Sequence, residues 1–167
     1  LLGAEVSGSG TSAAIVIGHQ PCETFPAYPC RSEVQIVGLP DLAPLSTSQI
    51  ITDGNDAPIS FTPDESMVAL GSAIGQLRLI DVTTGDLVAA AGPIDVAKRV
   101  LALAHIDQRT LLSAHADGDL VLWRLEEDVL VETARMPDIH ATALAVEGTD
   151  RVFIGTATGE VSIHAGT

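Results

Sequence analysis

Three side chains near the middle of the sequence have the residue types of a hydrolytic triad. Ser113, His115 and Asp117 stand at every second position, so in an extended strand their side chains point to one side. A serine beside a histidine and an acid can act as a nucleophile with its general base. Acyl transfer also needs hydrogen-bond donors aimed at the oxyanion, and no stretch of the sequence indicates such donors. We therefore expect no catalytic residues and no enzymatic activity.

A second group of reactive side chains lies near the N-terminus. Cys22 and Cys30 lie in HQPCETFPAYPCRS, the stretch from His19 to Ser32. If this stretch is a hairpin loop, the two cysteines are close enough for a disulfide, and two free thiols are the alternative. His19 adds a third possible zinc ligand, but the spacing fits no standard zinc motif and a fourth ligand is missing. We expect neither a metal site nor a cofactor.

A short segment rich in side-chain oxygens, TDGNDAP, runs from Thr52 to Pro58. It lacks the twelve-residue length and the final glutamate of the helical calcium loop. A turn between strands favours the same residues, because Asp and Asn hydrogen-bond to their own backbone. We interpret the segment as a turn.

The segment from Ile59 to Ala91 predicts four short strands joined by turns. Met67 to Gly71 is apolar almost throughout, as in a strand buried on both faces, whereas Gln76 to Asp81 alternates between polar and apolar residues. Turn residues interrupt the runs at Pro63 to Ser66 and at Thr83 to Asp86. Four antiparallel strands in so short a segment form one small sheet, which cannot bury both faces by itself.

The same pattern recurs along the chain. Gly75-Gln76-Leu77, Gly118-Asp119-Leu120 and Gly159-Glu160-Val161 follow one another at spacings of 43 and 41 residues. A fainter copy lies at the start, where VSGSGTSAAIVIGH matches ISFTPDESMVALGS without a gap, so that Gly18 stands for Gly71. A period of about 40 to 45 residues with four strands per unit is typical of β-propeller blades. The predicted fold class is therefore all-β, a propeller of four-stranded antiparallel blades.

The third copy, LLSAHADGDLVLW, ends at Trp123. Its serine, its Asp-Gly pair and its closing tryptophan resemble the repeat of the WD-repeat β-propeller family. The resemblance implies that Ser113, Asp117 and Trp123 form a structural hydrogen-bond set with a histidine from the loop that leads into a blade. No such histidine is evident for this copy, although His140 stands just ahead of the fourth copy. Arg124 also departs from the family pattern, which has an aspartate after the tryptophan.

The number of blades does not close a ring. We expect a single partial propeller domain over residues 1–167, with blades at about 4–56, 57–98, 99–139 and 140–167. The last blade ends after its third strand, and the resemblance implies a ring of about seven blades. The remaining blades then belong to further sequence or to another chain, and a homodimer that completes an eight-bladed ring is the alternative.

Function in a propeller depends on its loops, because the strands fill the core. The loop with both cysteines also carries Phe25 and Tyr28, which three prolines stiffen into a candidate anchor for a partner; an insertion that folds over its own blade is the alternative. The candidate partner-binding residues are Phe25, Tyr28, Asp53, Asp56, Asp95, His115 and Asp138.

The charge balance bears on the partner. Eight basic and 22 acidic residues give a net charge of −14, and Lys98-Arg99 is the only adjacent basic pair. Nucleic acids and anionic membranes are bound by clustered Lys and Arg, so we expect neither. A basic protein partner fits better, although an acidic surface also simply keeps a protein soluble. No signal peptide is evident, and we expect an intracellular, cytoplasmic protein.

The resemblance implies a non-catalytic scaffold that holds other protein subunits together in a complex. Two alternatives stay open. The first is a propeller enzyme, a quinoprotein-like oxidoreductase or a hydrolase, although an aromatic content of 3% offers few rings to stack on a cofactor. The second is a regulatory or sensor propeller attached to a catalytic domain.

Overall fold

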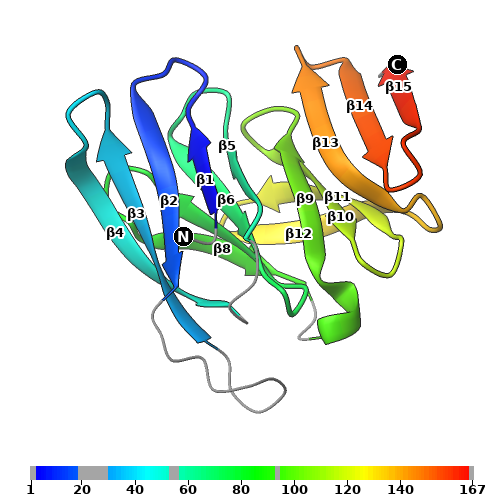
Figure 1. Cartoon of the computed structure of the whole chain (residues 1–167), viewed down its shortest axis with the longest axis horizontal. Helices are drawn as coiled ribbons and strands as arrows, with labels where there is room; N and C mark the ends of the chain where they lie inside the picture. The colour runs from blue at the N-terminus through cyan, green and yellow to red at the C-terminus, as the bar shows by residue number, and fades with distance from the viewer. Residues whose placement is uncertain (1–2, 19–29, 53–56, 93–94, 166–167) are drawn as a thin grey trace.

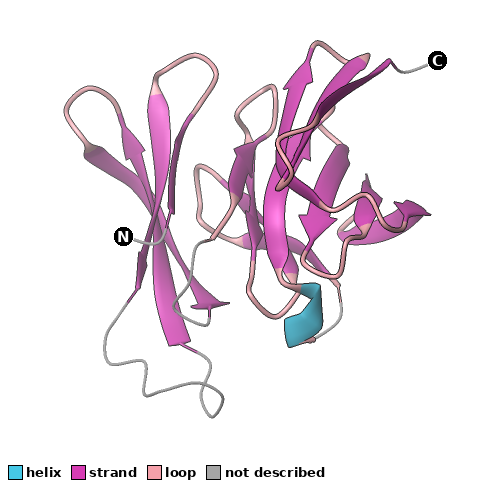
Figure 2. Ribbon diagram, turned by 45° about the vertical axis from the view of Figure 1, so that its right-hand side comes forward, coloured by secondary structure: helices cyan, strands magenta, loops and turns pink. Residues whose placement is uncertain are grey.

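The computed structural model describes residues 3–18, 30–52, 57–92 and 95–165. Within these ranges almost all regular structure is β-strand, and the only helix is the short 3-10 turn η1, Val96–Lys98 (Figure 2). No helix in the described ranges is long and apolar enough to cross a membrane. The all-β fold class predicted from the sequence is confirmed.

The described strands form four antiparallel sheets, and in each sheet the strands neighbour one another in chain order (Figure 1). The strands are β1 (Gly3–Val6), β2 (Ser12–Gly18), β3 (Cys30–Gly38) and β4 (Ala43–Thr52) in the first sheet, β5 (Ile59–Phe61), β6 (Met67–Gly71), β7 (Leu77–Asp81) and β8 (Leu87–Ala91) in the second, β9 (Val100–His105), β10 (Thr110–His115), β11 (Leu120–Glu126) and β12 (Val129–Met136) in the third, and β13 (Ala141–Glu147), β14 (Arg151–Thr156) and β15 (Val161–Ala165) in the fourth.

The sheets stand next to one another as the blades of a propeller do. The first strands pack in sequence, with β1 against β5, β5 against β9 and β9 against β13. These four are the inner strands, and on the outside β8 of the second blade contacts β12 of the third. The fourth blade has three described strands, so β12 has no corresponding outer neighbour there.

The sequence repeat is present in the backbone geometry. Gly75, Gly118 and Gly159 all have positive φ, at 82°, 97° and 86°, at the turn before the third strand of their blades. Glycine reaches this region without steric cost. Each turn is closed by the same pair of backbone hydrogen bonds. The glycine N–H donates one of them at 3.0–3.2 Å, and the N–H of the residue three positions before the glycine (Ser72, His115 or Thr156) donates the other at 2.8–3.0 Å. Blades two to four therefore share one register.

The first blade corrects the alignment made from the sequence. Ser7 N–H closes the turn between β1 and β2 with a hydrogen bond of 2.9 Å, and Thr62 N–H does the same between β5 and β6. Ser7 therefore corresponds to Thr62, and the gap-free match of Gly18 to Gly71 is two residues out. A strand has a side-chain period of two residues, so a shift of two keeps every side chain on its own face. The hydrophobic pattern alone does not reveal such an error.

The third strand of the first blade is also longer than predicted. β3 begins at Cys30, within the stretch that the sequence analysis assigned to a loop, and pairs with β4 as far as Thr52. Residues 19–29, with Cys22, Phe25 and Tyr28, lie outside the described residues.

Buried apolar side chains lie between the blades. One cluster joins the first blade to the second, with Val16 and Ile36 against Val68 and Leu70. Two further clusters fill the next two joints. The core is therefore a series of sheet-to-sheet contacts, and each blade depends on its neighbours to bury its two faces.

Candidate functional site

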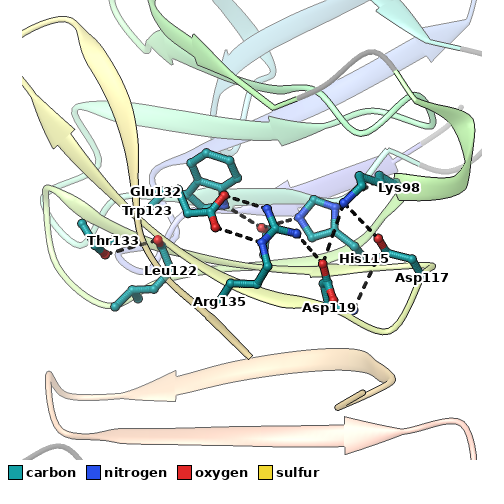
Figure 3. Close-up of polar contacts among 10 residues, drawn as sticks. Lys98, His115, Asp117, Asp119, Leu122, Trp123, Glu132, Thr133 and Arg135 are labelled. Carbon is teal, nitrogen blue, oxygen red and sulfur yellow. Dashed lines mark hydrogen bonds and ion pairs between the residues drawn. The ribbon is translucent and has the colours of Figure 1, made fainter. Parts of the chain in front are cut away.

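The polar centre of the third blade is built around Ser113, which is fully buried in β10. Trp123 of β11, which pairs with Leu111 in the ladder, donates its Nε1–H to Ser113 Oγ at 2.7 Å. His115, two residues along the same strand, places Nε2 2.7 Å from the same Oγ. Its Nδ1 lies 2.9 Å from the backbone carbonyl of Lys98. One chain of hydrogen bonds thus links β11, β10 and the segment that leads into β9 (Figure 3).

The Lys98 carbonyl, at one end of this series of hydrogen bonds, determines which atoms carry the protons. Because a carbonyl oxygen only accepts, His115 Nδ1 carries the proton and donates to Lys98. Nε2 then accepts from the Ser113 hydroxyl, whose oxygen is free to accept from Trp123. This arrangement needs a neutral imidazole. Burial lowers the pKa of His115, against the opposing effect of the hydrogen bond to Lys98, so the neutral form is favoured.

Two sequence-based assignments change at this point. His115 was placed on a partner-binding rim, but its side chain is buried, with 4% exposed, and both ring nitrogens are engaged. The histidine of the polar centre comes from β10 itself, while the loop leading into the blade contributes only the Lys98 carbonyl. The two-residue spacing from Ser113 to His115 is the signal that could have found this, since alternate residues of a strand share a face.

Asp117 lies at the surface next to this centre, in the turn between β10 and β11. Its carboxylate accepts from the Asp119 N–H at 3.2 Å and lies 3.3 Å from Lys98 Nζ. Partial burial acts to raise the pKa of Asp117, but the hydrogen bond and the lysine outweigh it, and the pKa is lowered. His115 Nδ1 bonds to Lys98 rather than to Asp117, so Asp117 fixes the turn and does not extend the chain of hydrogen bonds.

An ion-pair network continues across the edge of the third blade (Figure 3). Lys98 Nζ lies 3.8 Å from Asp119, and Arg135 of β12 pairs with both Asp119 and Glu132. The Arg135 pKa is raised by its hydrogen bonds to Glu132 and Asp119. This network was not predicted from the sequence, although Arg135 and Asp119 come together across the β11–β12 pair.

His140 and Asp138 lie in the connection between the third and fourth blades. Both are exposed and have positive φ, at 50° and 60°. The His140 N–H donates to Gly118 O at 3.1 Å, and a Cβ added to Gly118 would come within 2.6 Å of the His140 ring. His140 therefore packs over the turn of the third blade, where only glycine leaves room. Ser113 is bonded by His115, not by His140.

The remaining candidates divide into described and undescribed residues. Asp95 is half-buried, and its carboxylate accepts from the Ala97 N–H at 2.9 Å, which fixes the start of η1. Asp53 and Asp56, like Phe25, Tyr28 and Cys22, lie outside the described residues. Within the described ranges no group of three or more His, Cys, Asp and Glu side chains is placed to hold a metal ion.

The Ser113–His115 pair resembles a nucleophile with its base, but its surroundings oppose acyl transfer. Ser113 is 0% exposed, so no substrate carbonyl reaches its oxygen. That oxygen also accepts the indole N–H of Trp123, which lowers its nucleophilicity. The arrangement acts as a structural link between strands.

The solved structures that are similar to this chain include the following three. A chain in the crystal structure of the Mitotic Checkpoint Complex matches with a TM-score of 0.70 and 15% identity, over 99% of this chain and 48% of that one. The Cps50 (Swd1) β-propeller domain of Myceliophteria thermophila matches with a TM-score of 0.68 and 13% identity, over 97% and 52%. BamB from Moraxella catarrhalis matches with a TM-score of 0.62 and 13% identity, over 86% and 42%.

These likenesses define the fold. At 13 to 15% identity they establish a β-propeller architecture, here a partial propeller whose fourth blade has three described strands. The predicted β-propeller fold is confirmed. The chain spans about half the length of the structures that it matches. No protein-family model matches the chain, and no curated protein does.

Proposed function

We propose that this chain is part of a non-catalytic propeller scaffold that assembles with other protein subunits, and that a further blade covers the open face of its fourth blade. The observation that carries the proposal is the exposure of that face. Val161 is 70% exposed and Ile163 is 62% exposed. Two branched apolar side chains that face water on one sheet indicate a surface made for another macromolecule.

Matched positions in the second blade show what such a surface normally contacts. Leu77 and Leu79 occupy the places of Val161 and Ile163, and they are 0% and 2% exposed. Both belong to the cluster that packs against the third blade. The third strand of each blade therefore presents these positions to the blade that follows, and the fourth blade presents them to solvent.

The outer edge of the fourth blade is open in the same way. Thr156 N–H donates to Glu160 O at 3.0 Å, and hydrogen-bonded pairs alternate along an antiparallel ladder. The N–H groups of Val161 and Ile163 therefore point away from β14, towards the free edge. Beside this edge lies an apolar groove of about 180 Å³, lined by Leu122 and Met136 of the third blade and by Val152 of the fourth. A fourth strand would fill the groove and pair with the edge.

A following blade fits this surface better than an arbitrary protein does. Every joint in the chain packs the forward face of one blade against the back of the next, so the open face continues an existing interface. The matched structures are about twice as long as this chain. One of them is a chain in the crystal structure of the Mitotic Checkpoint Complex, which supports protein partners in general.

The experiment is to purify the protein from its natural source through a tag and to introduce the pair Val161→Asp and Ile163→Asp. We expect further copies of the repeat of about 41 to 43 residues either in the same polypeptide or in a second protein that copurifies with the wild type. If the further blades belong to another chain, the variant should lose that partner. If they belong to the same polypeptide, the variant should unfold. The matched control is Val129→Asp, at a residue that is 57% exposed on β12.

Two results would overturn the proposal. The first is a wild-type chain that stays a stable monomer with no repeat-containing partner. The second is a closed homodimer in light scattering that the double substitution dissociates, because a second copy then covers the face.

A further inference from the structure

A hollow lies between β15 and the third blade, beside the edge of β15 that is free in Figure 1. One part of it has a volume of about 580 Å³ and is lined by Glu160 and Asp138. The other part is the apolar groove of about 180 Å³ described above. The two parts share three lining residues, which are Ile139, Ile154 and His164. We call the two parts together the trench; it is apolar beside the end of β15, where His164 pairs with Val152, and acidic beside the start of this strand, which Glu160 directly precedes.

The third blade has its outer strand and shows which charge belongs at the acidic end. Arg135 of β12 pairs with Val121 in the ladder and forms an ion pair with Asp119. Asp119 directly follows the turn glycine of the third blade, and Glu160 directly follows that of the fourth. Glu160 therefore occupies the place of Asp119. Among the described residues no cation pairs with it.

The second blade is the neutral counterpart of this arrangement. Gln76 follows its turn glycine. Ala90 of β8 takes the place of Arg135, because each pairs in its ladder with the third residue after the turn glycine. The outer strand thus carries a cation where the blade has an acid after this glycine, and a neutral residue where the blade has an amide.

A second position of β12 shows what the apolar end of the trench accommodates. Leu130, five residues before Arg135, is 6% exposed and belongs to the apolar cluster between the second and third blades. In the fourth blade the apolar groove is lined by Leu120 and Ile154, which belong to the cluster between the third and fourth blades. A large aliphatic side chain in this groove would extend an interface that already exists.

We propose that the trench holds an outer strand that runs antiparallel to β15 and carries an arginine or a lysine opposite Ser162, the counterpart of Val121. The basic side chain pairs with Glu160, and a large aliphatic residue five positions earlier fills the apolar groove. Backbone hydrogen bonds to the free edge supply the affinity of such a strand, and the pockets for its side chains supply the specificity. The strand belongs to the polypeptide that carries the following blade, so this proposal rests on the proposed function.

The test uses a synthetic peptide with the sequence of residues 129–138, VLVETARMPD, which has the aliphatic and the basic residue at the required spacing. Titration into the purified chain, followed by NMR, should shift the amide signals of β15. The matched control is the same peptide with Ala134 and Arg135 exchanged, which keeps composition and charge but moves the cation to the other face of the strand. It should bind at least about threefold more weakly.

Charge reversal tests the ion pair itself. Glu160→Lys should weaken binding of the original peptide at least about threefold, and Arg135→Glu in the peptide should restore binding to this variant. Both effects should decrease in 1 M NaCl. Asp128→Asn removes an exposed carboxylate outside the trench and should leave binding unchanged. Amide spectra report whether each variant is folded.

Four results would overturn the proposal. They are no binding of the peptide at about 1 mM, equal binding of the two peptides, no rescue by the reversed charge, and a dimer of the chain that Glu160→Lys dissociates, because a second copy then occupies the trench. The proposed function fails separately, if the protein from its natural source has no polypeptide with further repeats, whatever the peptide does.

Discussion

The second and fourth blades place similar residues at the same positions and in opposite surroundings. Leu77 and Leu79 of β7 are buried against the third blade, whereas Val161 and Ile163 of β15 face solvent. Both pairs follow a glycine of positive φ and the same turn hydrogen bonds. The backbone of a blade is thus determined locally by its own repeat, but the burial of its forward face is determined by the neighbour.

Truncating one residue of each pair in the isolated chain tests whether the buried and the exposed positions differ in their contribution to stability. Leu79→Ala removes side-chain atoms from a filled joint and should lower the free energy of unfolding by about 2 to 5 kcal/mol. Ile163→Ala removes atoms that already contact water and should change it by no more than about 0.5 kcal/mol. Urea denaturation measures both. Equal losses would mean that the face of the fourth blade is covered in the isolated chain.

The third blade has a polar centre at positions where the second blade has apolar side chains. Leu70 and Ile80 occupy the places of Ser113 and Trp123, and both belong to one buried apolar cluster. Ser113→Ala leaves the Trp123 indole N–H and His115 without a shared partner, so we expect a loss of about 1 to 3 kcal/mol in the free energy of unfolding.

A double-mutant cycle separates this effect from packing. Trp123→Phe in the Ser113→Ala background should cost less than the same change in the wild type, because the indole N–H has already lost its acceptor. Strictly additive losses in urea denaturation would show that Ser113 and Trp123 do not act as a unit.

Acid probes the covered joint between the second and third blades. His105 is buried against Ser60, and burial lowers its pKa to about 4, so the folded state resists protonation. Stability is therefore complete above the unfolded pKa of about 6.5 and falls as the pH decreases. Between pH 6.5 and 5.5 this residue should remove about 1 kcal/mol. Glu5 acts in the opposite direction, because its raised pKa contributes stability at low pH that is lost as the pH rises towards 7.

The measurement is urea denaturation across this pH range in the Glu5→Gln background, with and without His105→Gln. The His105→Gln variant should lose less of its free energy of unfolding on acidification than the protein that keeps His105. The loss that remains is attributed to His115. Identical slopes would contradict the assignment to His105.

The smallest expected effects lie at the blade surfaces. Arg135→Gln breaks the network with Asp119 and Glu132, and should cost no more than about 1 kcal/mol at low salt and less in 1 M NaCl. Arg151→Gln in the fourth blade breaks one more exposed pair with Glu147 and should cost less still. Thermal melts at two salt concentrations compare them, and a larger effect at Arg151 would reverse the expected order.

The repeat could be predicted because it is local. Turn glycines, apolar runs and the period of 43 and 41 residues predict blades two to four in their observed register. The first blade was aligned two residues out, because a shift of two leaves the pattern of faces unchanged. Only the hydrogen bond at Ser7 determines the register there.

The polar sites could be predicted only in part. Ser113 and Trp123 were paired through the resemblance to the WD repeat, whereas the role of His115 depends on how close the Lys98 carbonyl comes. Arg99 Nε is buried without a hydrogen-bond partner, and no spacing in the sequence indicates this.

We propose that the fourth blade is completed by an outer strand on the free edge of β15 and by a following blade on its open face. Amide hydrogen exchange at Val161 and Ile163 reports directly whether that outer strand is paired with β15. Both N–H groups should exchange rapidly in the isolated chain. In the protein purified with its partner blades, they should be protected at least about a hundredfold, to the level of Leu77 and Leu79. Equally rapid exchange in both preparations would contradict the claim.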